Sequence, residues 1–206
     1  MKSRIAREVR RSDLTTQIAE AISSAIGSYQ DQRWYFNESR DLTFSTVADQ
    51  EFYSSTDDAD IGLIKKIDYV KIYYDDNPQE LDVKTSEHME WLSQNGTQTG
   101  EPRNYCYYNR KIRLYPIPSE VYTVRVAGVI KLAEPATDGE ANNAWMIDGE
   151  RLIRSRAKYE LALHVLRDKR LAEEMGSAVQ EAEAQLRRDT IQQTATEGWL
   201  VTATKF

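Results

Sequence analysis

Apolar positions recur at helical spacing near the start of the chain. Between residues 13 and 29 they form one stripe, which consists of Leu14, Ile18, Ala21, Ile22, Ala25, Ile26 and Tyr29. Ser12 or Asp13 stands just before this stripe, and both residue types are favoured at helix N-caps. The pattern predicts an amphipathic helix over residues 13–29.

The periodicity then changes to that of β-strands. Residues 33–36 and 42–46 are rich in β-forming side chains. An apolar and tyrosine-rich run at 64–74 is followed by the turn residues 75–78 and then by Leu81 and Val83. We therefore expect strands from residue 33 onward and a hairpin over residues 64–83.

Further short elements follow in the middle of the chain. Thr85 can cap a short helix that ends at Asn95-Gly96, and the Asn109-Arg110 turn predicts a second hairpin over residues 105–115. The clearest strand is 122–132, where alternate positions are apolar or glycine: Tyr122, Val124, Val126, Gly128, Ile130 and Leu132.

Helical spacing returns after the polar stretch that ends at Asn143. Asp148 and Asp168 stand before two predicted helices, which carry apolar positions such as Leu161 and Val179. The fold class is therefore α+β: a helical bundle, made of the N-terminal helix and two C-terminal helices, with an inserted antiparallel β-region and an extended C-terminal tail. We expect three parts, namely a helical platform at 1–36 and 140–188, a β-rich domain at 37–139 and a C-terminal arm at 189–206.

Composition and charge narrow the function. The chain has 206 residues, is 40% hydrophobic and carries a net charge of −6, which argues against wrapping of nucleic acid. Residues 1–11 are basic, whereas acidic residues are frequent in the middle. These segments indicate either solvated faces or a basic arm that contacts an acidic partner surface. No stretch approaches the roughly 20 apolar residues of a membrane span, and no signal-peptide run is recognisable, so we expect a soluble, cytoplasmically made protein without membrane contact.

Candidate catalytic chemistry is sparse. A lone Cys106 and two histidines, His88 and His164, predict neither an internal disulfide nor a zinc site, and no phosphate loop, nucleophile elbow or zinc-protease motif is present. Residues 57–60 lack the glycine and distal glutamate of a calcium loop, so we interpret them as a solvated acidic turn. We expect no enzyme, no cofactor and no metal, with a hydrolase that uses residues 57–60 or Glu87 and His88 as a remote alternative.

The order of elements resembles the head-to-tail adaptor proteins of short-tailed and related bacteriophages, also called connector or tail tubular proteins. The segments that carry the resemblance are Leu14 to Tyr29 with 33–37, 43–46 with 51–53, 100–105 with 112–118, the 122–126 strand and the helix from Glu150 to Leu166. The main alternative, suggested by the many tyrosines and tryptophans, is a β-rich carbohydrate- or protein-binding module flanked by helices.

The resemblance implies a structural virion protein at the head–tail junction, made in the bacterial cytoplasm. It implies a ring of copies, expected to be twelve-fold, that lies under the portal, extends the DNA channel and contacts a downstream tail protein, while DNA passes without specific binding. The C-terminal segment would dock on the portal through Trp199, Leu200, Val201 and Phe206. Contacts to other subunits or to the tail are expected from aromatic residues, namely Trp34, Tyr35, Tyr73, Tyr74 and Trp91.

Overall fold

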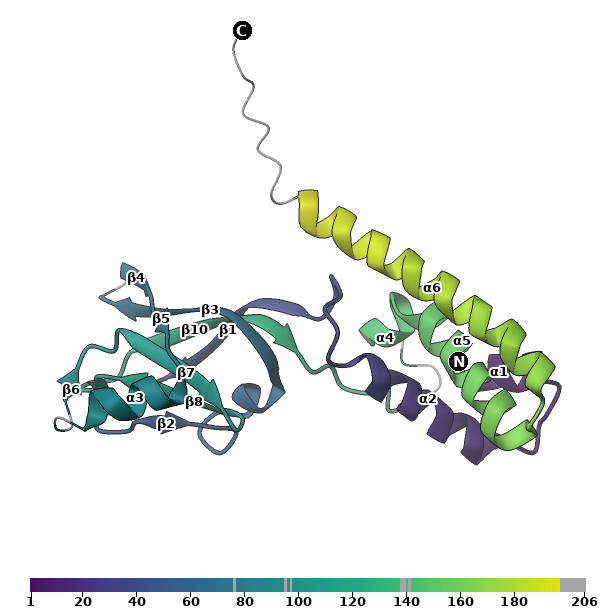
Figure 1. Ribbon diagram of the computed structural model, residues 1–206, viewed down its shortest axis with the longest axis horizontal. Coiled ribbons are helices and arrows are strands. Elements are labelled where there is room, and N and C mark those ends of the chain that lie inside the picture. Colours follow the sequence, from purple (N-terminus) through teal and green to yellow (C-terminus); the bar gives the residue numbers. More distant parts are fainter. Residues whose placement is uncertain (76, 95, 97, 138–139, 141, 197–206) are drawn as a thin grey trace, which may run out of the picture. The chain divides into compact units, whose positions relative to one another are not determined.

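The computed structural model describes residues 1–196 apart from residues 76, 95, 97, 138–139 and 141 (Figure 1). The chain forms two compact units. The helical unit comprises residues 1–36 together with the chain from residue 132 onward, and the β unit comprises residues 37–131. The elements confirm the predicted α+β class. None of the described helices has the length and apolarity needed to cross a membrane.

The helical unit is built from α-helices and one π-helical stretch. These elements are α1 (Lys2–Glu8), α2 (Thr15–Tyr29), α4 (Ala144–Ile147), α5 (Glu150–Glu160), the π-helix η2 (Leu161–Leu166) and α6 (Lys169–Thr196). The apolar stripe of α2 is buried as predicted and joins a core that includes Ile153, Leu161 and Val179 of the C-terminal helices. Burial of one apolar face in this way supplies most of the stability of helices of this length.

Residues 33–36, expected to be a strand, instead form part of the helical core. Trp34 is fully buried, and its indole Nε1 donates a hydrogen bond to the carbonyl oxygen of Tyr29 at 3.2 Å. The Phe36 ring packs edge-on against Trp145 at 5.2 Å between centroids. Aromatic side chains suit a half-buried sheet and a helical core equally well, so their composition alone predicted the wrong element.

The basic N-terminal segment is a short helix that the apolar pattern did not reveal. Ile5 of α1 is fully buried, and Glu8 lies 3.0 Å from Arg154 and 2.9 Å from Lys158 of α5. Burial acts to raise the pKa of Glu8, but its bonds to Lys158, Arg154 and Arg4 outweigh burial and lower the pKa. The part of the basic N-terminal segment that forms α1 therefore packs on the helical unit of its own chain.

Two of the expected helix caps are not formed. Asp13 pairs with Arg11 at 2.7 Å, and α2 has no side-chain cap. Asp148 accepts a hydrogen bond from the Tyr35 hydroxyl, and α5 begins after Gly149 without a side-chain cap. Asp168, by contrast, caps α6 by accepting from the backbone N–H of Leu171 at 3.0 Å.

The last helix is longer than the sequence pattern predicted. α6 continues to Thr196, so it includes residues 189–196, which we had assigned to the extended C-terminal arm. Short-range bonds support this continuation: Arg187 bonds Glu183 one turn earlier, and Gln185 bonds Asp189. The part of the predicted arm at 197–206 lies outside the described residues.

The β unit consists of two four-stranded sheets and one small sheet. Sheet A has the order β1 (Glu38–Ser45), β10 (Thr123–Ile130), β3 (Ile64–Tyr74) and β4 (Asn77–Glu80), and all its pairs are antiparallel. Sheet B has the order β2 (Phe52–Tyr53), β8 (Lys111–Tyr115), β7 (Asn104–Tyr108) and β5 (Asp82–Val83), where β5 pairs parallel to β7. Strands β6 (Thr99–Gly100) and β9 (Ile117–Pro118) form the small sheet.

The two large sheets bury their apolar faces in one core. Sheet A contributes Val70, Ile72 and Val126, and sheet B contributes Tyr105 and Leu114. Helix α3 (Ser86–Ser93) is capped by Thr85 as expected and packs Met89 near Cys106 and Tyr115 of sheet B. The 3-10 helix η1 (Ala59–Leu63) adds Ile61 to the sandwich core.

The predicted hairpins are present, with one change of partner. Asn109 and Arg110 both adopt left-handed backbone conformations and join β7 to β8, where Tyr108 pairs with Lys111. The 64–83 segment does form the β3–β4 hairpin, but Val83 leaves it and pairs with Tyr105 of sheet B. A chain that crosses between sheets in this way has no periodic signature in its sequence.

Candidate interaction surfaces

Of the aromatic residues predicted to form subunit contacts, Trp34 and Tyr35 lie in the helical unit. Trp34 is fully buried inside a single chain, with the Arg187 guanidinium 5.6 Å from its ring, so it is a core residue and not a surface one. The Tyr35 hydroxyl donates to a carboxylate oxygen of Asp148 at 2.8 Å. Burial and this bond raise the pKa of Tyr35 to about 12.

Trp91 is the most exposed of these residues. It lies on α3 with 58% of its surface accessible, and its ring stacks on that of His88 at 5.5 Å. An exposed tryptophan is costly to leave in water and is a frequent anchor in protein interfaces. Its position on a helix that is pinned to sheet B makes it available to a partner without rearrangement.

Tyr73 and Tyr74 line a polar cavity of about 400 Å³ at one end of sheet A. The Tyr74 ring packs edge-on against Tyr122 at 5.1 Å, and its hydroxyl donates to the carbonyl oxygen of Pro102. Burial, followed by the nearby charge of Glu101, raises the pKa of Tyr74. Glu120 also lines this cavity, which therefore combines tyrosine rings with carboxylates.

Arg113 is a buried cation in β8, where it alternates with the apolar Ile112 and Leu114. Only 6% of its side chain is exposed, and it donates to Glu51 at 2.5 Å, to Glu90 at 2.6 Å and to the Ser93 hydroxyl at 2.9 Å. Its guanidinium also lies 5.2 Å from the Phe52 ring. The network ties α3 to sheet B, and the helix explains the burial because it covers the face that strand alternation predicts to be solvated.

A second hollow lies beside this network. It encloses about 210 Å³, and its lining includes the exposed rings of Phe52 and Tyr108 together with the buried Cys106. Burial raises the pKa of the Cys106 thiol. A thiol of this kind is a poor nucleophile at neutral pH because the thiolate is the reactive form.

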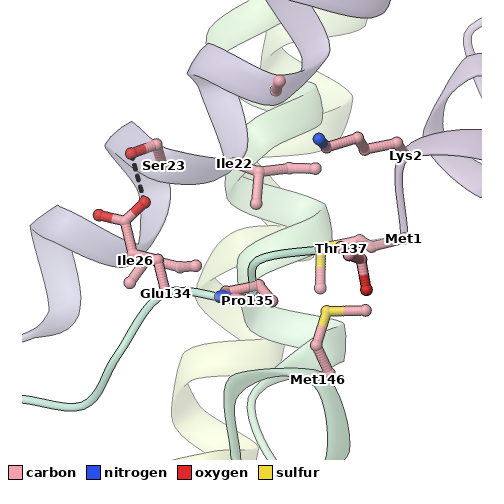
Figure 2. Close-up of a pocket in the computed structure, with 10 residues that line it drawn as sticks. Met1, Lys2, Ile22, Ser23, Ile26, Glu134, Pro135, Thr137 and Met146 are labelled. Carbon is pink, nitrogen blue, oxygen red and sulfur yellow. Dashed lines mark hydrogen bonds between the residues drawn. The ribbon is translucent and has the colours of Figure 1, made fainter. Parts of the chain in front are cut away.

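The helical unit has a small hollow between α2 and the segment that precedes α4 (Figure 2). Figure 2 shows Ile22, Ile26 and Met146 around it, with Met1 beside them. The Ser23 hydroxyl donates to Glu134 at 2.6 Å at its edge. The hollow encloses about 140 Å³, and its lining is mostly aliphatic and small polar but also includes Lys2 and Glu134.

The residues considered for hydrolysis are not assembled into a reactive group. In the described part of the chain, neither the imidazoles of His88 and His164 nor the Cys106 thiol forms a hydrogen bond to a base or an acid. Among the same residues, no three His, Cys, Asp or Glu side chains are placed to hold a metal ion. Asp57 instead accepts hydrogen bonds from Gln50 and Ser54, as a structural turn does.

The predicted portal-binding residues, Trp199, Leu200, Val201 and Phe206, lie outside the described residues. Comparison with known protein families matches residues 1–204 to a family model described as SU10 adaptor protein. A search of curated proteins found no match.

Proposed function

The chain belongs to the SU10 adaptor protein family, a family of bacteriophage adaptors, and from this membership we propose that it is a structural head-to-tail adaptor. In this proposal, copies of the chain form a ring, expected to be twelve-fold, beneath the portal. The ring extends the DNA channel and links the capsid to the tail. The family match over residues 1–204 is the observation that carries the proposal.

The surface of the chain is consistent with such a role. A ring is held by heterologous contacts, so one protomer must present two different faces that complement each other. Exposed Trp91 and the tyrosine-lined cavity at Tyr73 and Tyr74 are suited to contacts with neighbouring subunits or with the downstream tail protein. Tyr35 has intermediate exposure and is a further candidate for such a contact.

The charge of the chain bears on the DNA that would pass through the ring. A net charge of −6 disfavours tight phosphate binding, because each neutralised phosphate requires a positioned cation. A channel of this kind lets DNA slide without specific binding. We accordingly propose a structural virion component that performs no catalytic step of its own.

The proposal is tested by removing the chain from infected cells. Phage that carry a stop codon early in this gene should package DNA into heads but should lack attached tails, and complementation with the full chain should restore complete virions. Electron microscopy of purified particles gives the readout, and density for a ring of this chain under the portal in complemented particles completes the test. Normal tail attachment without the chain would contradict the proposal.

A further inference from the structure

The outer face of sheet A carries two cations at its centre. Along β3, the buried Val70 and Ile72 point into the sandwich core, so the alternate residues Tyr69, Lys71 and Tyr73 lie on the opposite, outer face. In the β3–β10 register Lys71 is the direct partner of Arg125. Residues paired in this way have Cβ atoms only about 5 Å apart, and like charges so placed are destabilising.

Each cation lies over an aromatic ring, and neither forms an ion pair with a carboxylate of the described residues. The Lys71 ammonium lies 5.1 Å from the centroid of Tyr69, and the Arg125 guanidinium lies 5.8 Å from that of Tyr73. Within the described residues neither forms an ion pair, and the Arg125 Nε is buried without a hydrogen-bond partner. We call Tyr69, Lys71, Tyr73 and Arg125 the charged face. Arg125 has the uncharged Thr43 as its other cross-strand partner, and Lys71 has Glu80, with which it forms no ion pair.

The surroundings favour protein carboxylates over DNA as the anion for this face. Glu80 of β4 is the other cross-strand neighbour of Lys71 and is exposed, and the whole chain is acidic. DNA would be repelled by these acidic residues along its whole length. A protein segment with only a few carboxylates can bind without approaching them. Arg and Lys over aromatic rings are also well suited to receive carboxylates at an interface.

The same unit presents such carboxylates on the acidic turn at residues 57–60. Asp57 is fixed by hydrogen bonds from Gln50 at 2.7 Å and from the Ser54 backbone N–H at 2.8 Å, and Asp58 accepts from the Asp60 N–H at 2.9 Å. Burial acts to raise the pKa of Asp57, but the bonds from Gln50 and Ser54 outweigh it and lower the pKa. Hydrogen bonds within the turn therefore fix the position of the Asp57 carboxylate and favour its ionised form.

Within one copy neither the acidic turn nor the charged face forms an ion pair among the described residues, although Glu80 lies across from Lys71 on β4. The two clusters are opposite in sign, are preorganised and are different from each other. Two such clusters on one protomer are what a heterologous contact requires, since each copy then offers its face to one neighbour and its turn to the other. Preorganised groups also lose little side-chain entropy on binding.

We propose that the charged face of one copy binds the acidic turn of a second copy, with Arg125 and Lys71 receiving the carboxylates of Asp57 and Asp60. This inference rests on the proposed ring and names the surfaces that join its subunits. It assigns an interface role to the turn that the sequence alone indicated to be merely solvated.

The test uses full-length protein and sedimentation velocity over a range of concentrations. Arg125→Glu puts an acidic residue in the charged face, and Asp60→Arg puts a cation in the acidic turn. In either variant alone, every contact between a face and a turn therefore brings like charges together. We expect each to associate at least about tenfold more weakly than the wild type. Lys111→Glu, an equal charge change in sheet B of the same unit, is the matched control and should associate like the wild type.

An equimolar mixture of Arg125→Glu and Asp60→Arg gives the decisive result. In the mixture every face meets a turn of opposite sign, so we expect association to return to within about threefold of the wild type, and the double variant Arg125→Glu/Asp60→Arg should do the same. If the single variants associate like the wild type, or if the mixture fails to recover, this interface is wrong and the ring proposal stands. A wild type that stays monomeric at all concentrations and also in purified particles would overturn both.

Discussion

Gly128 lies where β10 comes closest to β3. A Cβ atom at this position would stand 1.9 Å from the carbonyl oxygen of Lys66, and the register shifts between Ala127 and Gly128. The backbone itself would have to move, because no flexible side chain is there to yield. We expect Gly128→Ala to lower the free energy of unfolding by about 3 kcal/mol, as measured by denaturant titration followed by circular dichroism.

Gly100 provides the control for this substitution. A Cβ atom at Gly100 meets no heavy atom within 4 Å, so Gly100→Ala should change the free energy of unfolding by less than about 0.5 kcal/mol. Equal stability of the two alanine variants would show that the β3–β10 approach is not as tight as described.

Tyr35 gives the stability a pH dependence in the alkaline range. Burial first, and then the bond to Asp148, raise its pKa to about 12 from the ordinary value of 10.0. The folded state therefore favours the neutral phenol, and this contribution is complete below pH 10 and is lost as the pH rises through 12. Relative to Tyr35→Phe, the wild type should lose stability between pH 10 and 12. Thermal melts at several pH values check this, and parallel curves would contradict it.

At the scale of elements, the π-helical stretch η2 offers a matched pair of leucines. Leu161 is fully buried in the helical core, whereas Leu163, in the same stretch, is 39% exposed. Leu161→Asp buries an unpaired charge among apolar groups and should destabilise the fold by about 4 kcal/mol or more, while Leu163→Asp should cost under about 1 kcal/mol. A cooperative melt of Leu161→Asp at the wild-type temperature would refute the packing of this helix.

Elements with a strong period were predictable from the sequence, and those set by packing were not. The stripe of α2, the Thr85 cap of α3 and the Asn109-Arg110 hairpin follow from local spacing and turn chemistry, and all are present. Helix α1 has a single fully buried side chain, Ile5, which is too little apolar pattern to reveal a helix. β5 and the core position of Trp34 depend on partners distant in sequence, such as β7 for β5 and Arg187 for Trp34, which local propensity does not encode.

At the scale of the whole molecule, class and family were accessible from the sequence, but the charged surfaces were not. Alternation predicts that Lys71 and Arg125 lie on outer faces, yet only the β3–β10 register places them opposite each other. Arg113 shows the converse, because α3 buries a residue that alternation marks as exposed. Sheet register and the covering of a strand by a helix are features of the tertiary structure. They determine which charged side chains are accessible to a partner.

The last prediction concerns residues 197–206, for which we propose docking on the portal. These residues include Trp199, Leu200, Val201 and Phe206, and each buried anchor of this type contributes roughly 1–3 kcal/mol or more to an interface. Because α6 continues to Thr196, truncation after Thr196 removes the segment and leaves the helix intact, whereas a cut after Arg188 would also remove helical residues. We expect an unchanged melting temperature and at least about a hundredfold weaker binding to purified portal rings.

A full-length variant with Trp199→Ser and Phe206→Ser tests whether these side chains, and not the length of the segment, are needed for binding. It should lose portal binding to a similar extent as the truncated chain. Ile191→Ser, which alters an exposed apolar residue on α6 before the segment, is the control and should bind like the wild type. Residues 197–206 span at most about 35 Å when extended, so the portal surface must approach the end of α6. Native portal affinity of the truncated chain would exclude docking by this segment. Unfolding of the truncated chain would instead mean that Trp199 packs on its own helical unit.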